Sequence, residues 1–562
     1  MTKVEDNGLH FTGTAGKHAW KGNLDSVAFD EAGIKARLLN LAQPCYLVKA
    51  EGQLGFTNEG RLDTASVSWD AAPSVDTASV LLDAAPSVDT VEALLVAPPL
   101  LPEQLGDPEF LAFHKVKYAY TVGSMAQGIA SEEMVIALGK AGMLGSFGAA
   151  GLPPARIEAA IRRIQEALPE GPYAFNLIHS PSEEALERGA VELYLKYGVH
   201  TVEASAFLDL TPHIVRYRAS GLSLTADNQI EIQNKVIAKL SRREVATKFM
   251  QPAPAKILQE LVEKKLITEL QASLAAKVPM ADNITVEADS GGHTDNRPLV
   301  VLLPSIIALR DEIQQKYQYQ REILVGAGGG IGTPAAALAA FMLGAAYLVT
   351  GSISNSCIES GTSAHTKKLL AQAEMADVIM APSADMFEMG VKVQLLKRGT
   401  LFPMRSQKLY DLYRSYNSIE ELPTEERAIL EKQIFRKSLD TVWDETVAFF
   451  NERDPEQIAR AANNPKRKMA LIFRWYLGLS SRWSNTGEKG REMDYQIWSG
   501  PAMGAFNDWV RGSYLEESNN RKVVEVAWHV MTGAAFLYRL QSLKLQGLRL
   551  PSRYGQYYPT PR

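Results

Sequence analysis

The chain has 562 residues, of which 46% are hydrophobic and 22% charged, and its net charge is −5. This length can hold a large barrel with one or two smaller units, and the slight acidity argues against a general nucleic-acid binder. Cys45 and Cys357 are the two cysteines. Their number and separation argue against a disulfide framework or a cysteine-based zinc site and favour a reducing compartment.

Neither an N-terminal signal nor a membrane span is predicted. The first ten residues have no apolar core of the kind a signal peptide needs. The longest nearly uncharged apolar run, residues 334–350, is broken by Gly344 and is shorter than the ~20 residues of a spanning helix. We therefore expect a cytoplasmic protein.

A repeat rich in Pro, Ala and Ser follows a small N-terminal region, residues 1–62. Residues 63–75 are echoed by 76–88 and more loosely by 89–99. The period is too short, and the copies too few, for a solenoid. The sequence therefore predicts a linker or a surface insertion over residues 63–110, with no function of its own.

From about residue 117 the pattern alternates between strand and helix eight times. The predicted strands, some taken together with the loops that follow them, lie in residues 117–130, 143–151, 172–180, 200–207, 234–240 and 282–295, in the stretch from 323 to the glycines that begin at 328, and in residues 345–349. This alternation favours a single (β/α)8 barrel over residues 111–360. The alternative is a doubly wound sheet, which usually carries its phosphate-binding glycines after its first strand. Beyond the barrel we predict an α-helical subdomain, residues 361–545, and a tail, residues 546–562.

The most informative run is residues 323–352, where two strands end in small residues. The first strand runs into four glycines, Gly328, Gly329, Gly330 and Gly332, and Thr333 and Pro334 then begin an Ala-rich helix as N-cap and first-turn proline. Glycines let a phosphate approach backbone N–H groups, and the loops after strands seven and eight of a barrel are a frequent phosphate site. A tight turn packed against a helix is the alternative. The residues we expect at a cofactor phosphate are Gly328, Gly329, Gly330, Gly351 and Ser352.

The other strand ends also carry small or amide-bearing residues, which leave room for a flat ring and suit a flavin better than a metal. None of the nine histidines lies in a close ligand set such as HExxH. His293, after a glycine pair, is the candidate for acid–base chemistry or cofactor contact. The further cofactor contacts we expect are Met125, Ala126, Gln127, Gly128, Asn176, Gly291 and Gly292.

Two motifs carry a resemblance to a flavin family. Residues 289–295, DSGGHTD, resemble the A-G-G-H-x-G segment of the nitronate monooxygenase (2-nitropropane dioxygenase-like) barrels, a fold shared by FabK-type enoyl reductases. Residues 327–352 resemble their phosphate region, with Ser352 where Thr is usual. Asp289 and Ser290 stand where the family more often has Glu-Ala, so the acid–histidine pair of the family is retained only approximately.

Three longer segments, residues 381–416, 463–487 and 494–510, resemble the PfaD family, and the resemblance covers nearly the whole chain. That family comprises trans-acting enoyl reductases of polyunsaturated fatty acid synthases and polyketide synthases. The resemblance implies bound FMN, NADPH as reductant, and trans-2-enoyl thioesters on an acyl carrier protein as substrates. His293 then supplies a proton, stabilises the thioester oxygen or positions NADPH, and the sequence leaves these roles open.

An acyl carrier protein is expected to be acidic, and the C-terminal region offers basic residues that could dock it. The alternative is an ordinary solvated surface. We also expect a homodimer and no nucleic-acid partner. The basic residues are Lys392, Lys397, Arg398, Arg405, Lys408, Lys466, Arg467 and Lys468.

Three other functions compete with this interpretation. A nitronate monooxygenase-like flavin oxidase would use the same barrel with O2. A flavin-barrel scaffold subunit would use the aromatic C-terminal region for assembly, although core packing explains its tryptophans more simply. An inosine-monophosphate-dehydrogenase-like barrel needs a cysteine directly after Gly-Ser-Ile, where this chain has Ser354, with Cys357 three positions later. The tryptophans are Trp475, Trp483, Trp498 and Trp509.

Overall fold

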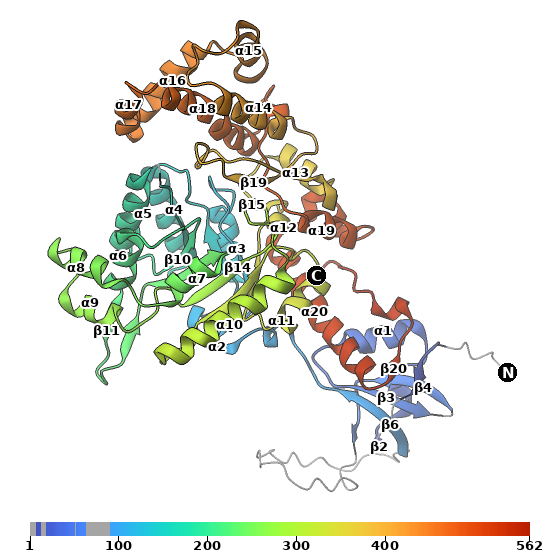
Figure 1. Cartoon of the computed structure of the whole chain (residues 1–562). Helices are drawn as coiled ribbons and strands as arrows, with labels where there is room; N and C mark the ends of the chain where they lie inside the picture. The colour runs from blue at the N-terminus through green and yellow to red at the C-terminus, as the bar shows by residue number, and fades with distance from the viewer. Residues whose placement is uncertain (1–6, 13–17, 51, 63–89, 182) are drawn as a thin grey trace. The chain divides into compact units, whose positions relative to one another are not determined.

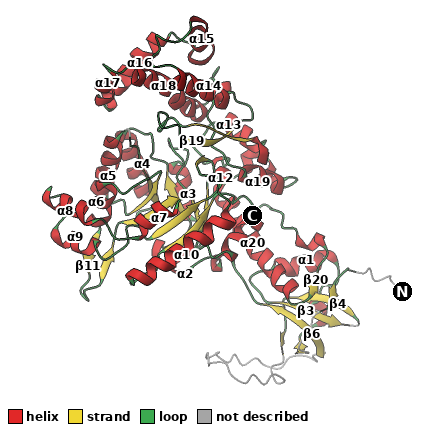
Figure 2. Ribbon diagram, viewed as in Figure 1, coloured by secondary structure: helices red, strands yellow, loops and turns green. Residues whose placement is uncertain are grey.

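The structure is a computed structural model that describes residues 7–12, 18–50, 52–62, 90–181 and 183–562 (Figures 1 and 2). The chain divides into two compact units. The first unit combines residues 1–105 with residues 529–558, and the second combines residues 106–528 with residues 559–562. The two ends of the chain therefore contribute to the same small unit, while the middle forms the large one.

The first unit is built on a five-stranded antiparallel sheet with the order β4-β3-β6-β2-β5. Trp20, Tyr46 and Val48 lie in its core. A short antiparallel pair joins β1 (His10–Phe11) to β20 (Leu548–Arg549). The remaining elements are β2 (His18–Lys21), α1 (Glu31–Leu39), β3 (Cys45–Ala50), β4 (Gln53–Thr57), β5 (Arg61–Leu62) and β6 (Thr90–Ala97).

Strand β6 differs from the sequence prediction, which placed its residues in a linker or insertion. Thr90–Ala97 forms the middle strand of the sheet, between β3 and β2. Its alternate side chains Ala93, Leu95 and Ala97 are buried, which is the period-two pattern of a half-buried strand. Residues 63–89, which hold the first two copies of the repeat, lie outside the described residues.

Helix α20 (Val523–Leu545) differs from the prediction as well, because its residues from His529 onward belong to the first unit and not to the helical subdomain. Arg539 is buried in that unit and donates hydrogen bonds to five backbone carbonyl oxygens. A buried guanidinium requires such partners, so the helix and the N-terminal segment depend on each other. The acceptors are the carbonyls of Leu38, Asn40, Leu41, Gln43 and Pro98.

The second unit contains a closed barrel of eight parallel strands, and this confirms the predicted (β/α)8 fold and excludes the doubly wound sheet. The strands follow one another around the barrel in chain order, each pairing in parallel with the next. They are β7 (Tyr120–Val122), β8 (Leu144–Phe147), β9 (Ala174–Ile178), β10 (Thr201–Ser205), β13 (Lys235–Leu240), β14 (Asn283–Glu287), β16 (Leu324–Gly328) and β17 (Leu348–Thr350).

Helices surround this barrel, and a small hairpin, β11 (Leu222–Leu224) with β12 (Ile230–Ile232), is inserted before β13 (Figure 2). Thr333 caps α11 as predicted: its Oγ1 accepts a hydrogen bond from the N–H of Ala336. The barrel helices are α2 (Pro108–His114), α3 (Glu132–Lys140), α4 (Pro154–Ala167), α5 (Glu184–Tyr197), α6 (Pro212–Ser220), α7 (Arg243–Met250), α8 (Ala255–Glu263), α9 (Glu269–Ala275), α10 (Leu299–Tyr317) and α11 (Pro334–Met342).

A three-stranded antiparallel sheet with the order β15-β19-β18 combines the segment after barrel strand β14 with two strands from beyond the barrel, and the predicted helical region continues from it. Its strands are β15 (Gly292–His293), β18 (Val378–Pro382) and β19 (Lys392–Leu396). The helices are α12 (Ser352–Asn355), α13 (Ala364–Ala371), α14 (Phe402–Ser415), α15 (Thr424–Ile429), α16 (Leu439–Arg453), α17 (Glu456–Ala461), α18 (Pro465–Thr486) and α19 (Ala502–Val510). No helix among the described residues is long and apolar enough to span a membrane.

A buried carboxylate ties the helical region to the barrel. Glu183, at the start of α5, accepts hydrogen bonds from Arg453 of α16 at 3.1 Å and from Arg474 of α18 at 3.0 Å. All three side chains are mostly withdrawn from solvent. Because a buried carboxylate is stable only when it is paired, this cluster fixes α16 and α18 relative to the barrel.

Candidate active site

Two adjoining pockets open at the carboxyl ends of the barrel strands. One is lined by the glycines that follow β16 and by Gly351 and Ser352, and we call it the glycine pocket. The other is lined by His293, Asp385 and part of α18, and we call it the histidine pocket. Their common wall shows that they form one cleft. It consists of Ser124, Met125, Lys239, Glu287, Gly291 and Trp498.

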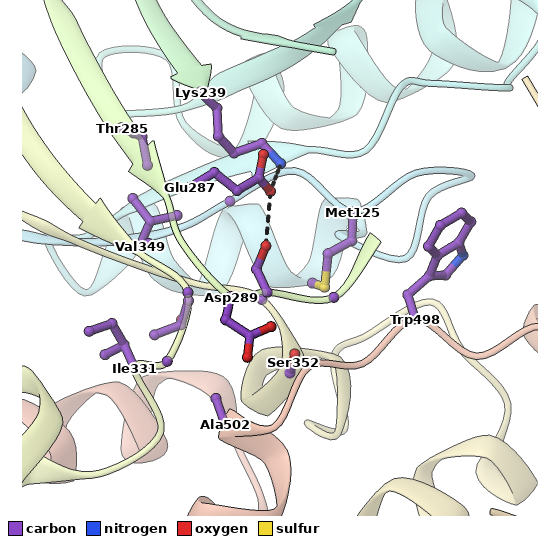
Figure 3. A pocket seen from close by; sticks show the side chains of 18 of the residues that line it. Met125, Lys239, Thr285, Glu287, Asp289, Ile331, Val349, Ser352, Trp498 and Ala502 are labelled. Atoms are coloured by element: carbon purple, nitrogen blue, oxygen red, sulfur yellow. Dashed lines mark hydrogen bonds and ion pairs between the residues drawn. The ribbon is translucent and has the colours of Figure 1, made fainter. Parts of the chain in front are cut away.

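The glycine pocket has bare backbone where a side chain would otherwise project (Figure 3). A Cβ atom added at Gly330 or at Gly351 would meet nothing within 4 Å. Gly329 and Gly330 both have positive φ, +84° and +76°, but Gly329 differs in its surroundings, because a Cβ there would lie 2.7 Å from the carbonyl carbon of Ala288. Gly330 and Gly351 thus leave room for a ligand, and Gly329 permits a close approach between two loops.

Ser352 lies at the edge of the glycine pocket and binds the C-terminal segment that covers it. Its Oγ accepts a hydrogen bond of 2.8 Å from the backbone N–H of Gly500. The covering segment also approaches the barrel loop closely, because a Cβ on Gly291 would lie 2.9 Å from backbone atoms of Ser499. Residues near 500, outside the predicted barrel, therefore form one side of the pocket.

A charged cluster lies in the wall shared by the two pockets. Lys239 Nζ is 2.9 Å from Glu287 Oε1, and the two side chains point toward each other (Figure 3). Glu203 is buried, and its carboxylate accepts hydrogen bonds from the hydroxyl and N–H of Ser124. Burial raises the pKa of Glu203, whereas for Lys239 the charges of Glu287 and Glu203 outweigh burial and raise its pKa. The lysine therefore stays positively charged at neutral pH.

His293 is paired with a carboxylate that the sequence did not indicate. Its Nε2 is 2.9 Å from Oδ2 of Asp385, and Ser383 donates a hydrogen bond to Oδ1 of the same carboxylate. Burial lowers the pKa of His293, but the charge and hydrogen bond of Asp385 outweigh that effect and the pKa is raised. Burial opposes the charge of Asp385, yet its pKa is lowered because His293 and Ser383 stabilise the carboxylate.

Asp289, the acid expected near the histidine from the family motif, binds other partners. Its Oδ1 accepts hydrogen bonds from Gln394 at 2.7 Å and from Asn296 at 2.9 Å. It lines the glycine pocket, where its carboxylate is visible in Figure 3. The motif therefore identified the histidine correctly. The carboxylate that pairs with this histidine is Asp385, which comes from the segment after β18, 92 positions further along the chain.

The other residues predicted to contact the cofactor lie together in the cleft, with one exception. Met125, Ala126, Gln127, Asn176 and Gly292 line the histidine pocket, but Gly128 lines neither pocket. The φ of Gly128 is +73°, so its left-handed backbone accounts for the glycine there, whereas a Cβ on Gly361 would lie 2.2 Å from the carbonyl oxygen of Gly128 and close packing accounts for Gly361. Asn176 uses its amide N–H groups on Glu203 O at 3.1 Å and Ser205 Oγ at 2.8 Å.

Several residues from the helical region line the histidine pocket and were not predicted as site residues. Leu477, Gly478 and Ser481 come from one face of α18, and Gln496 from the segment after it. Trp498 donates a hydrogen bond of 3.1 Å to Ser481 Oγ, so this tryptophan lines the cleft. The signal available in the sequence was the glycine inside a long helix, where glycine is unfavourable.

Cys357 does not have the environment of a nucleophile. It is fully buried, and burial raises the pKa of its thiol. A reactive cysteine needs access and a lowered pKa. The inosine-monophosphate-dehydrogenase-like alternative therefore has no support from this residue, and Cys357 packs as a small apolar side chain.

A closed (β/α)8 barrel, with a glycine-lined pocket after its last two strands and a histidine–carboxylate pair in the adjoining pocket, defines an enzyme of the class that binds a phosphate-bearing cofactor at the strand ends. The chain belongs to the nitronate monooxygenase family, whose model matches residues 108–407. This membership implies a flavin-dependent enzyme.

Two further family models match this chain, one before the barrel and one after it. The fatty acid synthase subunit PfaD N-terminal domain matches residues 20–86, and the inserted helical domain of acyl-carrier-protein S-malonyltransferase matches residues 416–495. The PfaD resemblance inferred from the C-terminal motifs is thereby confirmed.

Similar proteins come from lipid and polyketide biosynthesis. One component of the polyunsaturated fatty acid synthase of Thraustochytrium sp. is 51% identical over 447 residues, which are 78% of this chain and 30% of that protein. The polyketide biosynthesis protein PksE of Bacillus subtilis is 47% identical over 78% of this chain and 58% of its own length. The chain thus spans less than two thirds of these relatives.

A similar solved structure is the enoyl reductase domain of MlnA from the macrolactin biosynthesis cluster of Bacillus amyloliquefaciens. It has a TM-score of 0.74 and 37% sequence identity, and the match covers 78% of this chain and 99% of that domain. The likeness therefore extends over nearly the whole of that domain.

Proposed function

We propose that this chain is an FMN- and NADPH-dependent enoyl reductase that acts in trans on trans-2-enoyl thioesters carried by acyl carrier proteins of a polyunsaturated fatty acid or polyketide synthase. The observation that carries the proposal is the likeness to the MlnA enoyl reductase domain over 99% of that domain. We also propose a cytoplasmic location, supported by two buried free thiols, and retain the homodimer as a prediction.

The cleft fits a flavin mononucleotide by the chemistry of its lining. Gly328, Gly329, Gly330, Gly351 and Ser352 would hold the phosphate, and the backbone is open at Gly330 and Gly351. Asp289 lines the same pocket, and a carboxylate accepts hydrogen bonds from hydroxyl groups but repels phosphate. We therefore assign Asp289 to the hydroxylated chain of the cofactor.

The ring system would lie in the wall between the two pockets, near Met125, Lys239 and Gly291. When bound, FMN would accept a hydride from NADPH and transfer it to the β-carbon of the enoyl thioester. Lys239 supplies a fixed positive charge there, and Glu203 and Glu287 hold it in place. Such a preorganised charge favours the uptake of negative charge without rearrangement of solvent.

His293 is suited to deliver the proton that the α-carbon of the substrate needs. Asp385 occupies Nε2 and keeps the imidazole protonated to higher pH, which leaves Nδ1 for the substrate. A group with a pKa near the working pH is an effective general acid. The pair therefore supports proton donation over the alternative of merely positioning NADPH.

The test is an absorbance titration of the purified protein under anaerobic conditions. We expect visible flavin bands that bleach with NADPH and return on addition of crotonyl thioester. Return of the bands only on admission of oxygen would favour the oxidase, which the nitronate monooxygenase family model supports. A protein without flavin bands would favour the scaffold role and contradict the proposal.

A further inference from the structure

Gln496 carries a buried hydrogen-bond donor without a partner. Its side chain is 2% exposed, and its Nε2 contacts neither solvent nor any acceptor among the described residues. An unsatisfied buried donor costs about 1–3 kcal/mol. The residue lines the histidine pocket together with His293 and Trp498. A polar group left unpaired at this position is therefore available to a ligand.

The backbone on either side of Gln496 is held by several hydrogen bonds. The N–H of Gln496 donates to Ser480 O at 3.1 Å, and Ile497 O accepts from Leu396 N at 2.8 Å. Trp498 forms a bridge with Leu395 of β19. These contacts fix the position of the residue before any ligand arrives, so little order is lost when the amide is used.

Two other amides near the cleft are not available in this way. Gln394 donates to Asp289 and to the carbonyl of Ser290, and Asn176 donates to Glu203 O and Ser205 Oγ. Their N–H groups stabilise the loops that carry the site. Among Gln394, Asn176 and Gln496, it is Gln496 whose amide nitrogen is buried and unpaired.

We propose that Gln496 donates its Nε2–H to the thioester oxygen of the enoyl substrate and holds that oxygen as negative charge develops on it. This inference rests on the proposed function. The hydride brings two electrons to the β-carbon, the π electrons of the double bond move toward the thioester oxygen, and a proton from His293 then adds at the α-carbon. Gln496 keeps both of its protons. Its hydrogen bond is strongest when the oxygen is most negative, and this lowers the barrier.

The experiment compares Gln496→Met with a matched control, Gln457→Met. Gln457 is equally buried, but it donates to Asp454 at 2.8 Å and accepts from Arg467 at 2.5 Å. The readouts are the Tm of the cofactor-free protein, the flavin content, and the two half-reactions followed separately by stopped-flow absorbance. Gln496→Leu is made in parallel, so a poor fit of methionine does not decide the result.

We expect Gln496→Met to keep or raise the Tm, because it removes an unpaired buried donor. Its flavin content and its reduction by NADPH should match the wild type, while reoxidation by crotonyl thioester slows by about 100-fold or more. Gln457→Met should do the reverse, with a lower Tm and unchanged reoxidation.

Three results would overturn the inference. Unchanged reoxidation in both Gln496 variants would remove the role at the thioester. Loss of flavin from them would assign the amide to the cofactor. A wild-type protein whose reduced flavin is not reoxidised by the thioester would overturn the proposed function itself, and with it this role of Gln496.

Discussion

His293 and Asp385 are 92 positions apart in the chain, and Nε2 of the imidazole lies 2.9 Å from Oδ2 of the carboxylate. Strand β19 brings them together, because it pairs with β15, which ends at His293, and with β18, which precedes Asp385. The folded-state pKa of His293 is raised. The contribution of the protonated imidazole to stability is therefore complete below the pKa that His293 has in the unfolded chain. It is lost as the pH rises through the higher pKa that His293 has in the folded state.

Asp385→Asn removes the negative charge while it retains the shape of the side chain. We expect the pKa of His293 to fall, so the protonated imidazole disappears at a lower pH. The alkaline limb of the kcat profile for enoyl reduction should then move to lower pH by about one unit or more. The control is Asp295→Asn, since Asp295 binds Arg242 and Ser241. An alkaline limb at the same pH in Asp385→Asn would contradict the assignment.

His293→Ala removes the proton donor without touching the glycine pocket. We expect the purified variant to retain FMN and to be reduced by NADPH, whereas enoyl reduction falls by about 10²–10⁴-fold. Flavin absorbance and steady-state turnover check the two parts of this prediction. Turnover near that of the wild type would show that another group supplies the proton.

Gly351→Val tests the phosphate assignment without disturbing the fold. The φ of Gly351 is −132°, and a Cβ there meets nothing within 4 Å, so the free protein should fold with a nearly unchanged Tm. The added side chain would occupy the space assigned to the phosphate, and we expect most of the FMN to be lost. Gly189→Val, at a similarly open position on α5, is the control and should retain FMN. Equal flavin content in both variants would exclude a phosphate at Gly351.

Of the basic residues predicted to dock an acyl carrier protein, Lys392 and Lys397 are the ones that remain available to bind it. Both are exposed at the ends of β19 and form no ion pair with a described residue. We expect Lys392→Glu with Lys397→Glu to raise KM several-fold for an acyl-carrier-protein substrate and to leave KM for a pantetheine mimic unchanged. Measurement of both KM values in dilute and in concentrated salt checks this, because the docking term should weaken with salt.

Lys466→Glu serves as the contrasting variant. Lys466 donates hydrogen bonds to the carbonyl oxygens of Tyr413 and Tyr416 inside the helical region. We expect this change to lower the Tm and to impair both substrates alike. A selective loss of the carrier-bound substrate in Lys466→Glu would move the docking surface to that residue.

Gly478 on α18 leaves open space in the histidine pocket, since a Cβ there meets nothing within 4 Å. Gly478→Ala should stabilise the helix by about 1 kcal/mol. We expect Gly478→Leu to retain crotonyl reduction but to lose activity on long acyl chains, because its side chain fills the pocket. Rates for a series of chain lengths check this, and a uniform change across the series would contradict it.

The strand pattern was sufficient to locate the barrel. All eight strands are buried runs separated by amphipathic helices, and Thr333 and Pro334 mark a helix start by local chemistry alone. Strand β6 was missed because it follows the Pro-rich repeat, whose composition resembles a linker. The division at His529 was missed too, because a continuous helix gives no local sign of the unit it packs in.

The site was predicted where it depends on local motifs and missed where it depends on pairing between distant segments. The glycines and His293 carry their signal in adjacent residues. Asp385 and Gln496 do not, since β18, β19 and the bridge at Trp498 bring them to the cleft. Some of the basic residues are paired in ways that the sequence could not reveal, since Lys468 binds Glu420 and Arg405 binds buried Asp494.

Gly291 and the Ser499–Gly500 segment cross so closely that they limit each other's substitutions. At this crossing neither backbone tolerates even a methyl group, since a Cβ on Gly500 would lie 2.8 Å from the nitrogen of Gly291. The barrel and its cover therefore have to change together. A chimaera that exchanges the barrel between two relatives should work only if residues near 500 are exchanged with it, so these two distant stretches act as one module.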